Sequence, residues 1–135
     1  MRKDDCIFCK IVDGEIPSYK IYENEFVYAF LDIAKDVYGH TLVIPKQHFE
    51  NIFDCDEKYL SEVLKAIKLI ANHYKNLEFD GVNIINASGK DAEQTVFHLH
   101  FHIIPRKNGD NLKVFPTMPG ADEPLEIQLE KLKIN

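Results

Sequence analysis

The stretch Val96-Phe97-His98-Leu99-His100-Phe101-His102-Ile103-Ile104 decides the fold. Its residues alternate with a period of two, the side-chain period of a β-strand, and so predict a strand over 96–104. One face of that strand is wholly apolar and should pack on the core: it carries Phe97, Leu99, Phe101 and Ile103. The opposite face carries three histidines in a row, half of the six in the chain. That concentration indicates chemistry rather than a solvated polar face.

The spacing of these histidines limits what they can do. Alternate residues on one strand face lie roughly 6.6 Å apart, which puts the outer two histidines about 13 Å apart. Zinc lies only about 2.0–2.1 Å from each histidine nitrogen, so one metal could hardly bind His98 and His102 together. The pattern favours divided roles, in which one imidazole reacts and its neighbours orient it or bind elsewhere.

The pattern His-φ-His-φ-His-φ-φ, with φ apolar, resembles the signature of the histidine-triad (HIT) family of nucleotide hydrolases and transferases. Residues 98–104 match it at every position. Three earlier segments resemble the N-terminal half of the family, in the right order: Cys6–Ile11, Phe30–Asp32 and Gly39–Lys46. The resemblance runs from about Cys6 to Pro105, and it is specific because several separate motifs agree.

Hydrophobic patterning predicts an antiparallel meander, a long helix and two further strands. The expected elements are a short helix containing Cys6 and Cys9, strands at 19–23, 26–32 and 40–44, a long helix with Asp54 as its N-cap, a strand at 82–86, the histidine strand, and a C-terminal helix after Pro124. The fold class is therefore α+β: a five-stranded antiparallel sheet with a long helix and short flanking helices. The resemblance implies the same fold, and adds a homodimer whose two sheets continue across the interface.

Length and composition predict one domain over residues 1–135, with a core at about 6–105 and a tail and helix at 106–135. A net charge of −6 argues against a general nucleic-acid binder, which needs a basic face. No apolar run approaches the roughly 20 residues of a membrane span, and no signal peptide is expected at the N-terminus. With three cysteines, a disulfide framework is not expected and the cytoplasm is the predicted compartment.

The candidate catalytic residues are His40, His98, His100 and His102. A neutral imidazole is a good nucleophile toward phosphorus, provided that its other nitrogen is protonated and held by an acceptor. The central histidine of the three is best placed to be held in this way, and the resemblance implies the same residue, His100. It further implies that His102 donates a hydrogen bond near the phosphate or leaving group, and that His40 closes the cluster.

The resemblance also implies a nucleotide site. Asp32 would accept hydrogen bonds from the ribose hydroxyls, Asn86 would lie on the phosphate side, and Gln94 and Thr95 would donate to the phosphate or leaving group. Glu93 stands where relatives often have glycine, and its carboxylate would repel an anionic substrate. Six apolar residues would form the walls around a purine: Ile7, Phe8, Ile11, Ile16, Phe30 and Ile33.

A structural zinc site is a separate prediction. The Cys6-x-x-Cys9 pair alone also fits a short helix that buries two cysteines as small apolar side chains. The resemblance to zinc-containing family members supplies two further ligands, His48 and His98. All four positions hold suitable residue types.

Four functions remain open at this point. The leading one is an enzyme that cleaves nucleoside phosphoramidates or related nucleotidyl compounds through a nucleotidyl-histidine. The alternatives are a dinucleoside polyphosphate hydrolase, a nucleotide-binding module without turnover, and a zinc hydrolase that uses the triad histidines as metal ligands. The expected small-molecule partner is a purine nucleotide, with adenine and guanine both open.

Overall fold

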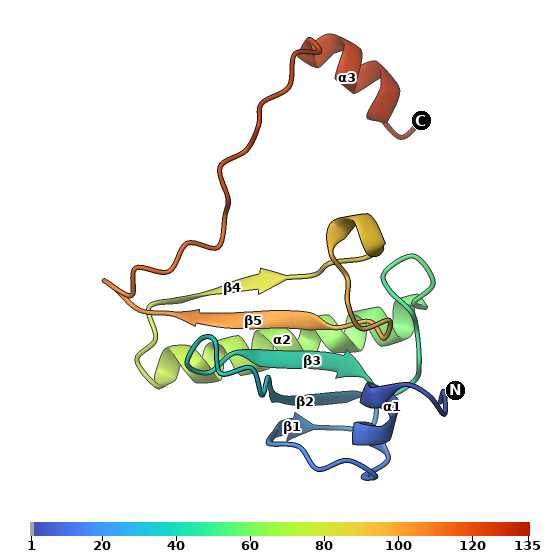
Figure 1. Ribbon diagram of the computed structural model, residues 1–135, viewed down its shortest axis with the longest axis vertical. Coiled ribbons are helices and arrows are strands. Elements are labelled where there is room, and N and C mark those ends of the chain that lie inside the picture. The colour runs from blue at the N-terminus through green and yellow to red at the C-terminus, as the bar shows by residue number, and fades with distance from the viewer. Residues whose placement is uncertain (1) are drawn as a thin grey trace.

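A five-stranded antiparallel sheet forms the centre of the computed structural model, which describes residues 2–135 (Figure 1). Its strands lie in the order β1-β2-β3-β5-β4. The elements are α1 (Ile7–Val12), β1 (Lys20–Glu23), β2 (Val27–Leu31), β3 (Thr41–Pro45), α2 (Glu57–Asn76), β4 (Gly81–Ile85), the 3₁₀ turn η1 (Lys90–Ala92), β5 (Phe101–Arg106) and α3 (Leu125–Leu132). The α+β fold and the meander of β1, β2 and β3 are thereby confirmed.

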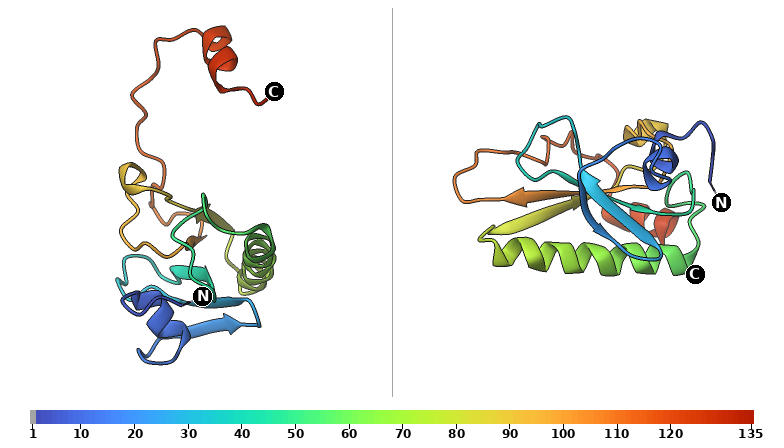
Figure 2. Two further views of the ribbon diagram at one scale, coloured as in Figure 1. Left: turned by 90° about the vertical axis from the view of Figure 1, so that its right-hand side faces the viewer. Right: turned by 90° about the horizontal axis from the view of Figure 1, so that it is seen from below.

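The two faces of the sheet are covered differently, as Figure 2 shows. The helix α2 runs across one face and buries the larger apolar cluster, which includes Val43, Leu99 and Ile103. The short helix α1 lies on the other face over a smaller cluster around Phe30 and Leu42. Since Leu42 is the register partner of His102 across β3 and β5, His102 belongs to this second face.

The long helix begins two residues later than the sequence predicts. Asp56 is its N-cap, because its side chain accepts a hydrogen bond from the Tyr59 backbone amide at 2.9 Å. Asp54 instead closes the preceding turn, where its carboxylate accepts from the amides of Glu50 and Asn51, each at 3.0 Å. The cap at Asp54 was wrong because two carboxylates compete in this segment, and only Asp56 reaches the third amide of the helix.

The histidine strand is shorter than its alternation predicts. The regular strand β5 starts only at Phe101, and the preceding residues bend away from the sheet. The amide of Leu99 donates to the Phe49 carbonyl at 2.7 Å, outside the strand ladders. Leu99 is fully buried as expected, but Phe97 is 41% exposed because the chain has left the sheet at that point. The polar neighbours of His98 and His100 therefore decide how these two rings are held.

After β5 the chain extends away from the sheet as a long segment that ends in α3 (Figure 1). The start of this segment is fixed by Arg106, whose guanidinium Nε lies 2.9 Å from the Asp110 carboxylate. Leu125, Leu129 and Leu132 are exposed on α3. None of the helices within residues 2–135 combines the length and the hydrophobicity that crossing a membrane requires.

Candidate active site and metal centre

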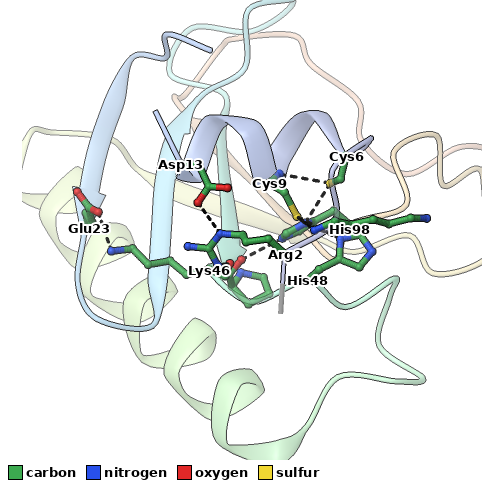
Figure 3. Close-up of polar contacts among 10 residues, drawn as sticks. Arg2, Cys6, Cys9, Asp13, Glu23, Lys46, His48 and His98 are labelled. Carbon is green, nitrogen blue, oxygen red and sulfur yellow. Dashed lines mark hydrogen bonds and ion pairs between the residues drawn. The ribbon is translucent and has the colours of Figure 1, made fainter. Parts of the chain in front are cut away.

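Two cysteines and two histidines converge at the N-terminal end of α1 (Figure 3). Cys6 is the N-cap of the helix, and its Sγ accepts a hydrogen bond from the Cys9 amide at 3.3 Å. Cys9 follows one turn later. His48 comes from the segment after β3, and His98 from the bent segment before β5. The fold thus brings together four candidate ligands from three separate parts of the chain.

The geometry of this cluster fits a tetrahedral zinc ion. The four ligand atoms lie within 4.8 Å of one another. Nδ1 of His98 is 3.3 Å from the Sγ of Cys6, 3.5 Å from the Sγ of Cys9 and 3.2 Å from Nδ1 of His48. Ideal tetrahedral zinc would separate two nitrogens by about 3.3 Å and a nitrogen from a sulfur by about 3.6 Å. With every position filled by protein, such a site is structural.

The His98 imidazole has the tautomer that a metal ligand needs. Its Nε2 donates to the Pro45 carbonyl at 2.9 Å, so Nδ1 keeps a lone pair directed at the cluster. The residue is completely buried, and burial lowers its pKa to about 4, so the ring is neutral near pH 7. Burial also raises the pKa of the Cys9 thiol to about 11. A bound zinc ion would offset that cost, because it stabilises the thiolate directly.

Arg2 links the chain before α1 to the residue after that helix and to the segment after β3 (Figure 3). Arg2 donates through Nε to Asp13 at 2.8 Å, and its guanidinium also contacts the Lys46 carbonyl. The Lys46 amine lies 2.6 Å from the Glu23 carboxylate. The Arg2 and Asp13 side chains are each more than a third exposed, so their pair contributes little stability. The Arg2 contacts thereby tie the two ends of the segment that carries Cys6 and Cys9 to each other and to Lys46.

His100 lies next to the Cys/His cluster, and its hydrogen bond defines which nitrogen is free to react. Its Nδ1 donates to the main-chain carbonyl of His98 at 2.7 Å, which leaves the lone pair on Nε2. The Phe8 ring packs edge-on against the imidazole, with 5.2 Å between ring centroids. Burial lowers the pKa of His100, so the ring is neutral near pH 7. His100 therefore has the charge state and the tautomer of a nucleophile.

A second histidine pair extends from His100 toward the loop after β2. The His102 and His100 rings lie 5.1 Å apart, and Nδ1 of His102 is 2.8 Å from Nε2 of His40. The other nitrogen of His40, Nδ1, donates to Asp36 at 2.8 Å. Asp32 approaches the same pair, with its Oδ2 3.8 Å from Nε2 of His40. Burial is the main cause that lowers the pKa of His102 to about 4.

Asp36 is a site residue that the sequence analysis missed. Its only sequence signal is a carboxylate four residues before His40 in a polar loop, which is common in any turn. Lys35 brings it into place by adopting a left-handed conformation, with φ of 55°. The hydrogen bond to His40 lowers the pKa of the Asp36 carboxyl, which is therefore ionised at neutral pH.

The polar residues expected around the nucleotide divide into two groups. Asp32 lies beside the histidines, where its Oδ1 accepts from the Ala34 amide at 2.8 Å. Thr95 and Glu93 are exposed. Asn86 is turned toward the protein instead, because its amide group donates to the His100 carbonyl at 2.9 Å. It therefore holds the backbone of the candidate nucleophile.

Gln94 is also engaged within the protein. The side chain is 5% exposed, and its Nε2 donates to the carbonyls of Glu50 at 2.6 Å and Val96 at 3.1 Å. Its Oε1 accepts from the Gly89 amide at 2.8 Å and from the Asn51 side chain at 3.3 Å. With both ends of the amide occupied, Gln94 shapes the loop between β4 and β5 and has no donor left for a phosphate.

The six apolar residues expected around a purine do not form one wall. Phe8, Ile11 and Phe30 are buried in the cluster under α1, and Ile16 packs at its margin. Ile7 and Ile33 lie outside that cluster and are 49% and 79% exposed. Ile33 directly follows Asp32, so its exposed side chain is available to a ligand there.

Comparison with known proteins supports the reading of these motifs. The family model of the HIT domain matches residues 13–109. An uncharacterised HIT-like protein of Borreliella burgdorferi is 47% identical over 132 residues, which cover 96% of this chain and 91% of the relative. The adenosine 5′-monophosphoramidase of Saccharomyces cerevisiae is 42% identical over 103 residues, 76% of this chain and 63% of the yeast protein.

A solved structure bears on the metal centre. The zinc-bound histidine-triad family protein of Mycobacterium smegmatis superposes with a TM-score of 0.78 at 42% identity. The match covers 86% of this chain and 84% of that one. A protein with the same fold and substantial identity therefore binds zinc.

Proposed function

Because this chain belongs to the HIT family, we propose that it hydrolyses nucleoside phosphoramidates or related nucleotidyl compounds through a covalent intermediate on His100. The observation that carries the proposal is the hydrogen bond from Nδ1 of His100 to the His98 carbonyl, which leaves Nε2 as a neutral nucleophile. The yeast relative, an adenosine 5′-monophosphoramidase, supports the substrate class.

In the first step Nε2 of His100 attacks the phosphorus, forming an N–P bond while the bond from phosphorus to the leaving amine breaks. The amine must gain a proton as it leaves, because an unprotonated amide ion is a very poor leaving group. His102 is the neighbouring imidazole that would supply it. In the second step water attacks phosphorus, the N–P bond to His100 breaks, and the nucleotide is released. One difficult displacement thereby becomes two easier ones.

Positioning makes up much of the remaining catalysis, as is general for phosphoryl transfer. Asp32 would accept from the ribose hydroxyls, with Ile33 beside it against the base. Thr95 would donate to the phosphate from the loop that Gln94 holds in shape. Asn86 fixes the His100 main chain, so that the nucleophile needs little reorganisation when substrate binds.

We propose that Cys6, Cys9, His48 and His98 hold a structural zinc ion. Bound zinc would cross-link α1 to the segment before β5. His100 is held through the main-chain carbonyl of His98 and is not itself one of the four ligands, so the reacting imidazole stays free for phosphorus. The four-residue Cys/His cluster therefore does not include the candidate nucleophile His100. That separation favours an HIT nucleotidyl hydrolase over a zinc hydrolase.

The homodimer implied by the resemblance is a further part of the proposal. It is supported by the extended position of α3, whose apolar side chains are exposed in a single chain. Sedimentation equilibrium of the full chain tests it, and a monomer at micromolar concentration would contradict it.

The enzymatic proposal is tested with wild type and His100→Ala on adenosine 5′-phosphoramidate and, side by side, diadenosine tetraphosphate. His73→Ala is the matched control, since His73 is exposed on α2 and belongs neither to the Cys/His cluster nor to the group of His40, His100 and His102. We expect wild type and the control to prefer the phosphoramidate and His100→Ala to retain binding without turnover. Rapid quenching should trap a nucleotidyl adduct on wild type. Turnover by His100→Ala near the wild-type rate would reject the covalent mechanism.

A further inference from the structure

The pair His40–His102 can exist in two protonation patterns, and they give opposite properties to the nitrogen that faces the site. The 2.8 Å separation of Nε2 of His40 and Nδ1 of His102 is a hydrogen-bond length, so one proton lies between them. If the pair is neutral, Asp36 keeps a proton on Nδ1 of His40, and the shared proton belongs to Nδ1 of His102. Nε2 of His102 is then an acceptor and cannot protonate a leaving group.

One added proton reverses this arrangement. A protonated His40 donates through both nitrogens, to Asp36 and to His102. Nδ1 of His102 then accepts, and its Nε2 must carry hydrogen. His102 becomes a donor, as the departure of an amine requires. The charge belongs on His40, because two carboxylates face it: Asp36 lies 2.8 Å from its Nδ1 and Asp32 lies 3.8 Å from its Nε2.

We propose that Asp36 is a positioning residue that keeps the added proton of the His40–His102 pair on His40. It thereby makes Nε2 of His102 a hydrogen-bond donor to the leaving group. We call the chain Asp36–His40–His102 the relay. This inference rests on the proposed function, because it concerns the departure of the amine. Asp36 acts through His40 and need not touch the substrate. Its role parallels that of a carboxylate that orients a histidine for acid–base chemistry.

The loop that carries Asp36 is built to hold this contact. The carboxylate Oδ1 that accepts from His40 also accepts from the Val37 amide at 2.9 Å, which fixes its direction although the side chain is 55% exposed. Lys35 enters the turn in a left-handed conformation that costs a non-glycine residue energy. Gly39 leaves it with φ of 77°, where a Cβ would lie 3.0 Å from the Pro105 side chain.

The proton balance closes over the two steps. In the first step the amine takes the proton on Nε2 of His102, Nδ1 of His102 takes the proton from Nε2 of His40, and His40 becomes neutral. In the second step the attacking water gives its proton to Nε2 of His102. The proton on Nδ1 returns to His40, which restores the starting state. No outside acid or base is required.

Two substrates separate this role from a merely structural one. Adenosine 5′-phosphoramidate releases an amine that needs a proton, whereas adenosine 5′-(4-nitrophenyl) phosphate releases a phenolate that leaves without one. Asp36→Asn keeps an oxygen that can accept from His40 but removes the negative charge. Glu62→Gln is the control, because it removes the same charge from the surface of α2, where Glu62 pairs with Lys58 and Lys65.

We expect Asp36→Asn to lower kcat for the phosphoramidate by roughly 10- to 100-fold and to change the aryl ester by less than about threefold. The alkaline limb of the phosphoramidate pH profile should move to lower pH, since Asp36→Asn removes the negative charge that stabilises protonated His40. The titratable groups that surround this proton are Asp32, Asp36, His40, His100 and His102. Glu62→Gln should show neither change.

Nitrogen-15 NMR of the histidine side chains provides a second measurement that is independent of turnover. Asp36→Ala should mix the tautomers of His40, whereas Asp36→Asn should preserve them. Two outcomes would overturn the inference while the proposed function stands. One is an equal loss of activity of Asp36→Asn on both substrates. The other is an unshifted alkaline limb in Asp36→Asn together with an unchanged His40 spectrum in Asp36→Ala. Failure of wild type to cleave either substrate would reject the proposed function itself, and with it the relay.

Discussion

The main-chain carbonyl of His98 accepts the Nδ1 hydrogen of His100 at 2.7 Å, so a residue of the Cys/His cluster also orients the candidate nucleophile. The His98 ring contacts Cys6 and Cys9, and its carbonyl accepts from His100. No strand ladder supports this segment, because β5 begins only at Phe101. Zinc bound by the cluster would therefore fix the chain before β5, where no strand hydrogen bonds do so. Its effect on catalysis would be indirect, through the position of the His98 main chain that holds His100.

The first prediction is the zinc content. One closed site with four protein ligands should retain about one zinc ion per chain through purification. Elemental analysis of the purified protein measures this directly. If no zinc is found, even after refolding in its presence, Cys6 and Cys9 are buried thiols and nothing more.

The second prediction separates stability from turnover in Cys9→Ala. Loss of a structural zinc site should cost more than about 4 kcal/mol, because metal binding contributes folding free energy directly. The thermal midpoint should fall by about 10 °C or more. Phosphoramidase activity of the protein that remains folded should fall only in part, since His100 keeps its carbonyl acceptor.

Cys55→Ala is the control for this variant, because Cys55 lies outside the four-residue cluster. It should melt close to wild type and bind the same amount of zinc. An unchanged thermal midpoint for Cys9→Ala together with complete loss of turnover would reverse the assignment and make the metal catalytic.

The third prediction concerns sugar recognition by Asp32. A carboxylate that accepts from ribose hydroxyls is worth roughly 1.5–3 kcal/mol as a charged hydrogen bond, or about 10- to 100-fold in affinity. Asp32→Ala should therefore lose most of its preference for AMP over deoxy-AMP in calorimetric titrations. Asp13→Ala, which removes a carboxylate at the end of α1, should keep that preference. If Asp32→Ala still distinguishes AMP from deoxy-AMP as wild type does, Asp32 has only a structural role, as acceptor for the Ala34 amide.

The fourth prediction compares Gln94 with its neighbour Thr95. Gln94→Ala leaves the carbonyls of Glu50 and Val96 without their donor, at about 0.5–1.5 kcal/mol for each lost hydrogen bond. Its thermal midpoint should therefore drop by several degrees. Thr95→Val removes only an exposed hydroxyl, so it should raise KM at an unchanged midpoint. A normal midpoint with a raised KM in Gln94→Ala would show that Gln94 contacts substrate after all.

These cases show what the sequence could predict. Alternation identified Leu99, Phe101 and Ile103 as core residues because the side-chain period survives where the ladder does not. The same alternation was wrong for Phe97, where the chain bends out of the sheet. The Cys/His cluster was found only through the family resemblance, since 92 residues separate Cys6 from His98 and spacing says nothing over that distance.

The site residues differ in how visible they were for a physical reason. The three histidines at 98, 100 and 102 could be recognised in the sequence because there are three of them and they alternate with apolar residues. The position of the Asp36 side chain depends on the left-handed conformation of Lys35. The role of Gln94 depends on which hydrogen-bond partners the folded loop places beside its amide. Both are properties of backbone conformation, which the identities of the side chains do not determine.

The last prediction is a pH dependence of stability that arises from His102. Burial lowers the pKa of His102 to about 4 in the folded protein, whereas an unfolded histidine titrates near 6.5. Between these values the unfolded chain binds more protons than the folded one, so stability rises with pH. The contribution of His102 is fully present above about pH 6.5 and is lost as the pH falls through about 4.

The measurement is the urea midpoint of wild type, His102→Asn and His73→Asn between pH 4 and pH 8. Zinc binding is itself pH-dependent, but it is common to all three proteins and cancels in their differences. The stability difference between wild type and His102→Asn should change steadily below about pH 6.5, in the direction that disfavours wild type as the pH falls. The exposed His73 variant should track wild type throughout. A constant difference between wild type and His102→Asn over that range would mean that the His102 ring is solvated enough to titrate normally, and that the charge of the His40–His102 pair is not confined to His40.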